Sequence, residues 1–340
     1  MKYIKTEDAV GQVLCHDITQ IIRGVTKDAV FRKGHVVTGK DIPVLLSVGK
    51  EHLYVWENDD TMLHENDGAE ILRRLCQGEG LRPSEVKEGK IELTATRDGL
   101  LKIHRDALLA VNRLGDMMIA SRHGDLPVKS GDKIAGTRII PLVIKKERME
   151  WAQEIVGSVP IFNVLPFGQK KVGVITTGSE VFKGRIKDTF TPVIEEKLAE
   201  YGQTMACHAL CDDDPDMVTR AIHDQMAKGC DLILCTGGMS VDPDDRTPLA
   251  IKNTGADIVS YGAPVLPGAM FLLAYKDGVP ILGLPGCVMY ARRTIFDLVL
   301  PRVLVDDPIT ADELASLGEG GLCLNCPTCV FPNCSYGHRG

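Results

Sequence analysis

The chain has 340 residues, of which 44 % are hydrophobic and 25 % are charged, and its net charge is −7 at pH 7. This length fits two or three domains that each bury a core, and the composition is that of an ordinary globular protein. No stretch approaches the roughly 20 apolar residues that span a bilayer, and no long run of Lys and Arg offers a surface for nucleic acid. We therefore expect neither a membrane segment nor a nucleic-acid partner.

The N-terminus and the cysteines bear on the cellular compartment. Residues 1–8 carry two acids where a secretory signal would carry its apolar region, so we expect the chain to be cytoplasmic. Seven of the eleven cysteines are scattered, as expected of small buried hydrophobes in a reducing compartment, whereas four crowd the last 18 residues. A crowded set of cysteines suggests a metal site.

Residues 1–60 are expected to form a small α+β region. The hydrophobic pattern predicts a strand at 29–31, a helix at about 40–47 and a strand at 53–56. Acidic and polar residues from 57 to 67 then break this pattern. We therefore place a boundary near residue 60.

Residues 61–168 are expected to form a second α+β region that ends in a connector. Short β-like runs dominate residues 91–143, and helical spacing predicts helices at about 104–114 and 147–156. Proline and glycine punctuate residues 157–168, which predicts an extended connector to the next domain.

Residues 169–310 show strands that alternate with helices. Such alternation predicts an α/β domain with a doubly wound, mainly parallel sheet that is covered on both faces. The expected strands are 172–175, 204–210, 232–235, 258–259, 271–274 and 281–284, and the expected helices are 192–201, 216–228 and 288–300. Sheets of this kind bind ligands at the carboxyl ends of their strands, so the loops there should carry the chemistry.

The first two of these loops are rich in hydroxyls and carboxylates. Thr177, Gly178 and Ser179 could hold a phosphate, and Glu180 could hold a cation or act as a base. The second loop has three consecutive acids at 212–214, which exceeds the single Asp that a helix N-cap needs. A hard divalent cation such as Mg²⁺ is therefore plausible at this edge.

The third loop, residues 236–247, combines paired glycines with hydroxyls and acids. Gly237 and Gly238 would permit close approach of a ligand, Ser240 could donate to a phosphate, and Asp245 could bind a metal. The fourth loop contains Pro285 and Gly286 and precedes a predicted helix, whose N-terminus could face an anion.

The order of these four motifs, TTGSEV, CDDDP, TGGMSVDPDD and LPG, resembles the molybdopterin-binding domain over about 135 residues. More closely, the chain resembles the molybdopterin molybdenumtransferases, the family that includes the E domain of gephyrin. The resemblance implies binding of adenylylated molybdopterin with Mg²⁺, and insertion of molybdate with release of AMP. It also implies a homo-oligomer.

The resemblance assigns roles residue by residue. Glu180, Asp213 and Asp245 match the acidic positions of the family, and Asp213 and Asp245 are the ones expected to bind the metal. The expected pterin or nucleotide contacts are Thr177, Gly178, Ser179, Gly237, Gly238, Ser240, Pro285 and Gly286.

The chain also departs from the family pattern. The Pro-Gly-Lys-Pro segment of the family appears here as residues 267–270, PGAM, and its later Lys falls at Pro248. Two Asn positions of the family fall at Cys287 and near Phe190. Residues 31–55 resemble the stretch that directly precedes the domain in the transferases, but here residues 58–168 intervene.

Two further departures concern local motifs. The family's Met-Asp-Gly loop has no clear equivalent, and we interpret Asp67, in the nearest similar string, as a turn residue. Arg246, Lys276, Arg292 or Arg293 could replace the missing lysines.

Residues 311–340 are expected to form a Cys-rich, metal-binding tail. Cys323, Cys326, Cys329 and Cys334 have the spacing C-x₂-C-x₂-C-x₄-C. Four thiolates this close would repel one another without a metal, and such sets suit Zn²⁺ or an iron–sulfur cluster. The spacing leaves both metals open.

Two hypotheses of function follow. The first is an enzyme, a divergent molybdenumtransferase in which Glu180, Asp213 and Asp245 organise Mg²⁺ and molybdate around the bound pterin. The second is a non-catalytic carrier or chaperone that holds molybdopterin for a client molybdoenzyme, with the Cys tail as a docking or redox element. Release of AMP from adenylylated pterin separates the two hypotheses.

Overall fold

The computed structural model describes residues 2–22, 26–55, 59–240, 242 and 245–338. The chain divides into two compact units, and each is described by itself. The first unit comprises residues 1–94, 104–122 and 133–162, and the second comprises residues 95–103, 123–132 and 163–340. The expected boundaries at 60, 168 and 310 remain predictions.

The N-terminal part of the first unit has its own small core. Strands β1 and β4 pair antiparallel, and β2 and β3 form a hairpin. The elements are β1 (Lys2–Lys5), η1 (Thr6–Asp8), β2 (Ile18–Ile22), β3 (Thr26–Phe31), α1 (Ile42–Ser47) and β4 (His52–Val55). Leu14, Ile18 and Leu53 are among the residues that pack in this core. Trp56, expected at the end of the second strand, lies outside the described residues.

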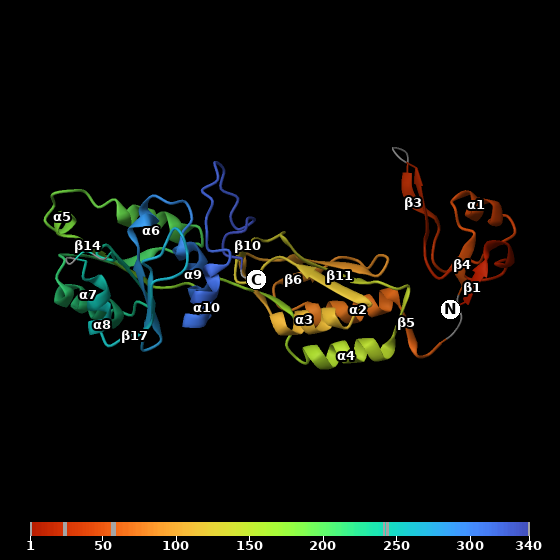
Figure 1. Cartoon of the computed structure of the whole chain (residues 1–340), viewed down its shortest axis with the longest axis horizontal. Coiled ribbons are helices and arrows are strands. Elements are labelled where there is room, and N and C mark those ends of the chain that lie inside the picture. The colour runs from red at the N-terminus through yellow and green to blue at the C-terminus, as the bar shows by residue number, and fades with distance from the viewer. Residues whose placement is uncertain (1, 23–25, 56–58, 241, 243–244, 339–340) are drawn as a thin grey trace. The chain divides into compact units, whose positions relative to one another are not determined.

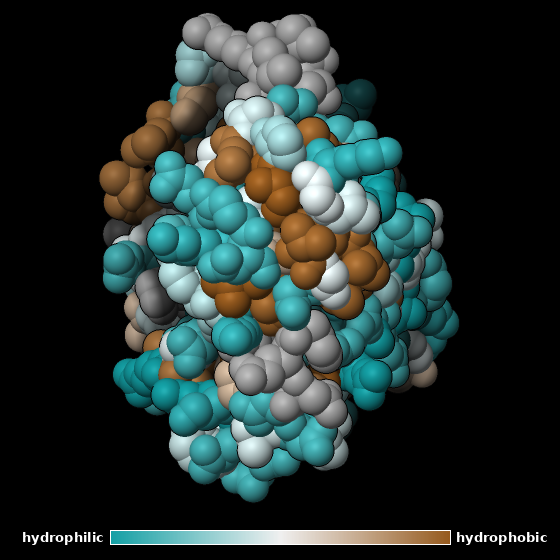
Figure 2. All heavy atoms as spheres, turned by 90° about the vertical axis from the view of Figure 1, so that its right-hand side faces the viewer, coloured by the Kyte–Doolittle hydropathy of each residue, from teal (hydrophilic) through white to brown (hydrophobic). Residues whose placement is uncertain are grey.

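Some hydrophobic side chains of this region reach the surface. Val36 and Val44 are exposed, with relative exposures of 51 % and 38 %. Figure 2 shows hydrophobic residues gathered among hydrophilic ones on one face of the molecule. Exposed apolar residues are a normal feature of folded proteins, so this surface alone does not indicate a partner.

The rest of the first unit is a sheet covered by helices, as the α+β prediction for this region expects. The sheet has the strand order β6-β7-β11-β9. Helices α2 and α3 pack against it, and α4 packs against α2 and α3 (Figure 1). A short antiparallel pair joins β5 to β12. The bounds are β5 (Met62–His64), α2 (Glu65–Cys76), β6 (Leu81–Pro83), β7 (Lys90–Ala95), α3 (Arg105–Arg113), β9 (Met117–Ser121), β11 (Lys133–Ile139), β12 (Val143–Lys145) and α4 (Lys146–Val156).

The interpretation of Asp67 as a turn residue is wrong. Asp67 lies in the first turn of α2, where an acid interacts favourably with the helix dipole. His64 caps this helix, because its Nδ1 accepts a hydrogen bond from the Asn66 backbone N–H at 3.1 Å. Gly68 continues the helix against Ile139 and Ile144, where a larger side chain would crowd both.

The second unit contains the expected α/β domain. Its sheet has six strands in the order β15-β14-β16-β19-β18-β17. The first four are parallel to one another, and β18 and β17 are antiparallel to their neighbours. The bounds are β14 (Val172–Thr177), β15 (Met205–Cys211), β16 (Leu232–Thr236), β17 (Asp257–Tyr261), β18 (Leu272–Lys276) and β19 (Val279–Leu284).

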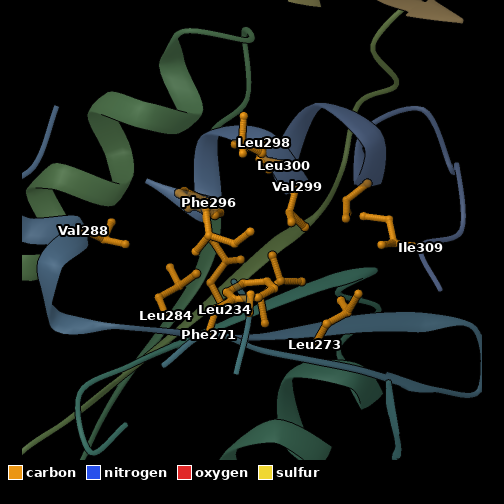
Figure 3. Packing of buried hydrophobic residues seen from close by; sticks show 14 of the residues in the cluster. Leu234, Phe271, Leu273, Leu284, Val288, Phe296, Leu298, Val299, Leu300 and Ile309 are labelled. Carbon is orange, nitrogen blue, oxygen red and sulfur yellow. The ribbon is translucent and has the colours of Figure 1, made fainter. Parts of the chain in front are cut away.

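Alternate residues of the strands supply two separate cores, one on each face of the sheet. Leu232 and Leu234 pack on the face that carries α6 and α9, and Ile233 and Cys235 pack on the face that carries α7 and α8. Figure 3 shows Phe296 and Val299 directed toward Leu234 and the strands. The helices are α6 (Phe190–Ala199), α7 (Pro215–Ala227), α8 (Thr247–Asn253) and α9 (Ile295–Val303). This two-sided burial confirms the doubly wound, mainly parallel sheet.

Segments from outside the predicted domain also belong to this unit. Strands β8, β10 and β13 form a separate sheet in the order β10-β8-β13. The bounds are β8 (Gly99–Ile103), β10 (Pro127–Val128) and β13 (Phe162–Leu165). Leu126 packs in the same core as Leu298 of α9. The connector expected at 157–168 therefore contains a strand, because β13 pairs with β8, which is distant in the sequence.

The helices described here do not include one that is both long enough and apolar enough to cross a membrane.

Candidate functional site

The four expected loops meet at one edge of the sheet because the parallel strands all end there. They line two adjoining cavities with volumes of about 920 Å³ and 660 Å³. Both cavities are lined by Gly237, Gly238, Asp245 and Gly286. Of the other predicted residues, Thr177, Gly178, Ser179, Glu180 and Asp213 line the larger cavity, and Ser240 and Pro285 line the smaller one. All of the residues expected to contact pterin or Mg²⁺ thus lie around one cleft.

Hydrogen bonds join the first loop to the second. The Ser179 backbone N–H donates to Oδ2 of Asp213 at 2.8 Å, and the Ser179 hydroxyl donates to Asp212. Lys183 Nζ lies 3.2 Å from Oδ2 of Asp212. Hydrogen bonds from the Ser179 hydroxyl and the Asp213 backbone N–H lower the pKa of Asp212 more than burial raises it, and Lys183 lowers it further. Asp212 therefore joins the first loop to the second through the Ser179 hydroxyl. Asp213 uses one carboxylate oxygen to accept the Ser179 backbone N–H.

The paired glycines of the third loop are required by the protein itself. Gly237 has a φ of +85°, and a Cβ there would lie 2.4 Å from the Thr177 carbonyl oxygen. A Cβ on Gly238, with a φ of +58°, would lie 2.7 Å from Oγ1 of Thr247. The Thr247 hydroxyl in turn donates to the Gly237 carbonyl at 2.9 Å. From the sequence we expected these glycines to let a ligand approach the backbone closely. In the structure, the atoms that lie closest to Gly237 and Gly238 belong to Thr177 and Thr247.

Asp245 is anchored within the third loop. Its Oδ2 accepts a hydrogen bond from the Ser240 backbone N–H at 3.0 Å, and its own N–H donates to the Asp242 carbonyl at 2.9 Å. The Tyr261 hydroxyl donates to the Met239 carbonyl at 3.0 Å. Burial, and then the charge of Asp245, raises the pKa of Tyr261. Asp245 is therefore oriented in the same way as Asp213, by a backbone N–H on Oδ2.

The fourth loop enters the cleft through a short 3₁₀ turn, η2 (Gly286–Met289). Within this turn, the Val288 side chain is fully buried and Met289 lines both cavities. Burial raises the pKa of the Cys287 thiol, which lines the smaller cavity. The long helix expected to begin at 288 begins instead at Ile295, because Thr294 and Asp297 form a capping box there.

Sequence reasoning missed a group of residues that reach the larger cavity from the segment after α5 (Ser179–Phe182). Lys183 and Lys187 bring positive charge to its wall, and Asp188 lies beside them. Asp188 accepts hydrogen bonds from the Phe190 and Thr191 backbone N–H groups at 2.8 and 3.1 Å. The signal in the sequence was a segment, residues 183–189, that carries three cations between the first loop and a helix.

The four cations that could have replaced the missing lysines are placed elsewhere. Arg246, Lys276, Arg292 and Arg293 do not line either cavity among the described residues. Arg293 binds Glu200 at 2.7 Å and Asp297 at 2.8 Å. Lys276 lies 3.7 Å from Asp277. Lys183 and Lys187 are therefore better placed than these four to meet a bound anion.

No metal site is preformed in the part of the chain that the structure describes. Three or more His, Cys, Asp or Glu side chains do not converge there on a point that could hold an ion. Cys323, Cys326, Cys329 and Cys334 nevertheless line one cavity, with a volume of about 440 Å³. The four cysteines thus line the same cavity, but they do not form a group that could hold a metal ion as they stand.

Comparison with known proteins identifies the domain that carries the cleft. Residues 173–304 match the family described as "Probable molybdopterin binding domain". This chain carries a divergent molybdopterin-binding domain. Residues 3–57 match a second family, described only as a domain of unknown function (DUF8806).

The curated relatives match this domain in part. A molybdopterin molybdenumtransferase from Synechococcus elongatus is 27 % identical over 161 residues, which cover 44 % of this chain and 38 % of the relative. A CinA-like protein from a Mycobacterium species is 36 % identical over 77 residues, which cover 23 % of this chain and 18 % of that protein. The chain therefore spans less than two fifths of the length of these relatives.

Among solved structures, the molybdopterin biosynthesis enzyme MoaB from Thermus thermophilus is similar to part of the chain. The match is 25 % identical, covers 42 % of this chain and 99 % of that one, and has a TM-score of 0.35.

Proposed function

We propose that this chain acts in molybdenum cofactor biosynthesis, and that it inserts molybdate into adenylylated molybdopterin with release of AMP. The observation that carries the proposal is the cleft of the molybdopterin-binding domain. All four loops at the strand ends contribute hydroxyls, glycines or carboxylates to it. Ligands of mainly parallel sheets bind at this edge.

The two predicted metal ligands fit Mg²⁺ that arrives with its substrate. Mg²⁺ is usually held by one or two carboxylates together with substrate phosphates, rather than by a complete protein cage. Asp213 and Asp245 are each oriented by a backbone N–H on Oδ2, which is the kind of support that metal-binding carboxylates receive. Bound Mg²⁺ would neutralise charge on the diphosphate as it is cleaved.

Other residues of the cleft support the same proposal. Lys183 and Lys187 offer positive charge to the phosphates or to molybdate. The Ser240 hydroxyl lies in a loop that lines the smaller cavity, where it could donate to a phosphate, whereas the Ser179 hydroxyl already donates to Asp212. Glu180 lines the larger cavity and is our candidate for orienting the cation or accepting a proton.

The test is AMP release in the presence of Mg²⁺ and molybdate. The double variant Asp213→Ala/Asp245→Ala should lose AMP release while its far-UV circular dichroism stays that of the wild type. Asp277→Ala is the matched control, because Asp277 is exposed on the hairpin between β18 and β19. Undiminished AMP release by the double variant would refute the assignment of the two aspartates.

A second candidate function is that of a carrier which holds molybdopterin for a client molybdoenzyme. It is favoured by the smaller cavity, which is lined by Ala269, Met270 and Cys287 and, among the described residues, by no Lys or Arg. Such a wall suits the pterin better than an oxyanion. A carrier would bind adenylylated molybdopterin without releasing AMP, so the same assay separates the two functions.

A further inference from the structure

The Cys-rich tail is a closed loop fixed to the second unit. The Gly337 N–H donates to the Gly320 carbonyl at 2.9 Å, which joins the two ends of the loop. The Leu266 N–H donates to Gly321, and the Cys323 N–H donates to Leu266, both at 2.8 Å. These bonds fix the two ends of the loop and the backbone of Cys323.

This loop encloses the cavity of about 440 Å³ that all four tail cysteines line. Arg292 and Arg293 also line this cavity. Arg292 Nη1 donates to the Pro327 carbonyl at 2.7 Å, whereas Arg293 is already paired with Glu200 and Asp297. Arg292 is therefore the cation that would favour a ligand with net negative charge.

Tyr336 supplies independent evidence that the cavity takes a ligand. It lines the cavity and is only 2 % exposed, and its hydroxyl has no hydrogen-bond partner among the described residues. A buried hydroxyl without a partner costs about 1–3 kcal/mol, which an acceptor in the cavity would recover.

The geometry favours a cluster over a single ion. Tetrahedral Zn²⁺ needs four sulfurs about 2.3 Å from one centre, whereas the four tail cysteines line a cavity of about 440 Å³. A polynuclear iron–sulfur cluster is bound by four cysteines at separate iron atoms, so it spreads its ligands over a larger volume. Sulfurs of a cluster also accept hydrogen bonds.

We propose that Cys323, Cys326, Cys329 and Cys334 bind one iron–sulfur cluster, and that the Tyr336 hydroxyl donates a hydrogen bond to one of its sulfurs. Each ligating thiol releases its proton to solvent as its sulfur bonds to iron. Pro267 and Tyr290 line both this cavity and the smaller cavity of the pterin cleft, so the cluster would lie beside that cleft. The proposal does not rest on the proposed function.

The experiment uses the full chain, purified without oxygen, incubated with Fe³⁺, a thiol reductant and sulfide, and desalted. We expect iron and acid-labile sulfide to be retained in equal amounts, with visible charge-transfer absorbance. The double variant Cys326→Ser/Cys329→Ser should lose both, and its fold should persist because both side chains are exposed. The matched control is Cys207→Ser, at a half-buried cysteine on β15 outside the cavity. It should retain iron and sulfide like the wild type.

Tyr336→Phe tests the hydrogen bond separately. Hydrogen bonds to sulfur stabilise the more negative, reduced cluster, so this variant should keep its iron and show a lower reduction potential. An unchanged potential would overturn the role of Tyr336. The cluster itself would be overturned by wild-type protein that retains no sulfide, by one tightly bound Zn²⁺ that excludes iron, or by equal loss in Cys207→Ser.

Discussion

Gly237 shows how a single residue sets the geometry of the cleft at the strand ends. Its positive φ and the nearby Thr177 carbonyl leave no room for a Cβ. We expect Gly237→Ala to destabilise the domain by about 1–3 kcal/mol more than a Gly→Ala change that adds only backbone strain. Gly278→Ala is that control, because Gly278 has a φ of +81° and nothing within 4 Å of its Cβ position. Chemical denaturation of both variants measures the difference, and equal losses would contradict the close approach.

A buried ion pair ties two helices together on one face of the sheet. Lys197 of α6 and Asp297 of α9 lie 2.7 Å apart, with side-chain exposures of 8 % and 3 %. We expect Lys197→Met to reduce the free energy of unfolding by about 3–5 kcal/mol, because it leaves a buried carboxylate with fewer partners.

The control for this prediction is the less buried pair of Lys276 and Asp277, which lie 3.7 Å apart and have side-chain exposures of 28 % and 77 %. Lys276→Met should cost about 0–1 kcal/mol, as surface ion pairs do. Denaturant titration of the two variants at neutral pH measures both values. A loss in Lys197→Met as small as that in Lys276→Met would mean that Arg293, which also binds Asp297, fully replaces Lys197.

Asp188, just before helix α6, accepts hydrogen bonds from the first backbone N–H groups of that helix. Burial tends to raise the pKa of Asp188, but hydrogen bonds from Thr191 and Phe190, together with His208, lower it overall. A lowered pKa means that Asp188 stabilises the fold above its unfolded pKa of about 3.9, and that this contribution is lost as the pH falls through the folded value.

The variant Asp188→Asn tests this pH dependence. We expect it to be less stable than the wild type by about 0.3–1 kcal/mol at pH 7, and the difference should vanish once the pH falls below the lowered pKa of Asp188. Thr189→Ala is the control, because the Thr189 side chain makes no capping hydrogen bond. A loss in Asp188→Asn that persists unchanged in acid would contradict an electrostatic role.

The sequence predicts the elements of the molybdopterin-binding domain well where hydrophobic patterns are local. Strands such as β14 and β16 are buried along their whole length and stand out as apolar runs. Helix α8 and strand β13 were missed because each is short and is stabilised by distant contacts. The start of α9 was placed too early, although Thr294 and Asp297 carry a capping-box spacing.

The candidate site was predicted in part for a related reason. Loops at the ends of parallel strands must meet at one edge, so the grouping of Ser179, Asp213 and Asp245 follows from topology. Lys183 and Lys187 reach the same cavity through an irregular segment whose path no periodic pattern specifies. Likewise, the spacing of the tail cysteines indicated a shared site but not the cavity that they surround.

At the scale of the whole molecule, the two units have separate cores and should unfold separately. Trp151, the tryptophan among the described residues, belongs to the first unit. We expect Lys197→Met, in the second unit, to shift the unfolding followed by far-UV circular dichroism while the transition followed by tryptophan fluorescence stays in place. Equal shifts with both probes would show that the units unfold as one.

Binding of molybdopterin by the cleft at the strand ends can be measured by titration calorimetry. Molybdopterin and its adenylylated form would be titrated into protein purified without oxygen, with and without Mg²⁺. We expect both to bind, with Mg²⁺ tightening only the adenylylated form, and with that gain lost in Asp213→Ala/Asp245→Ala. If neither compound binds the folded wild-type chain, the cleft is not a molybdopterin site.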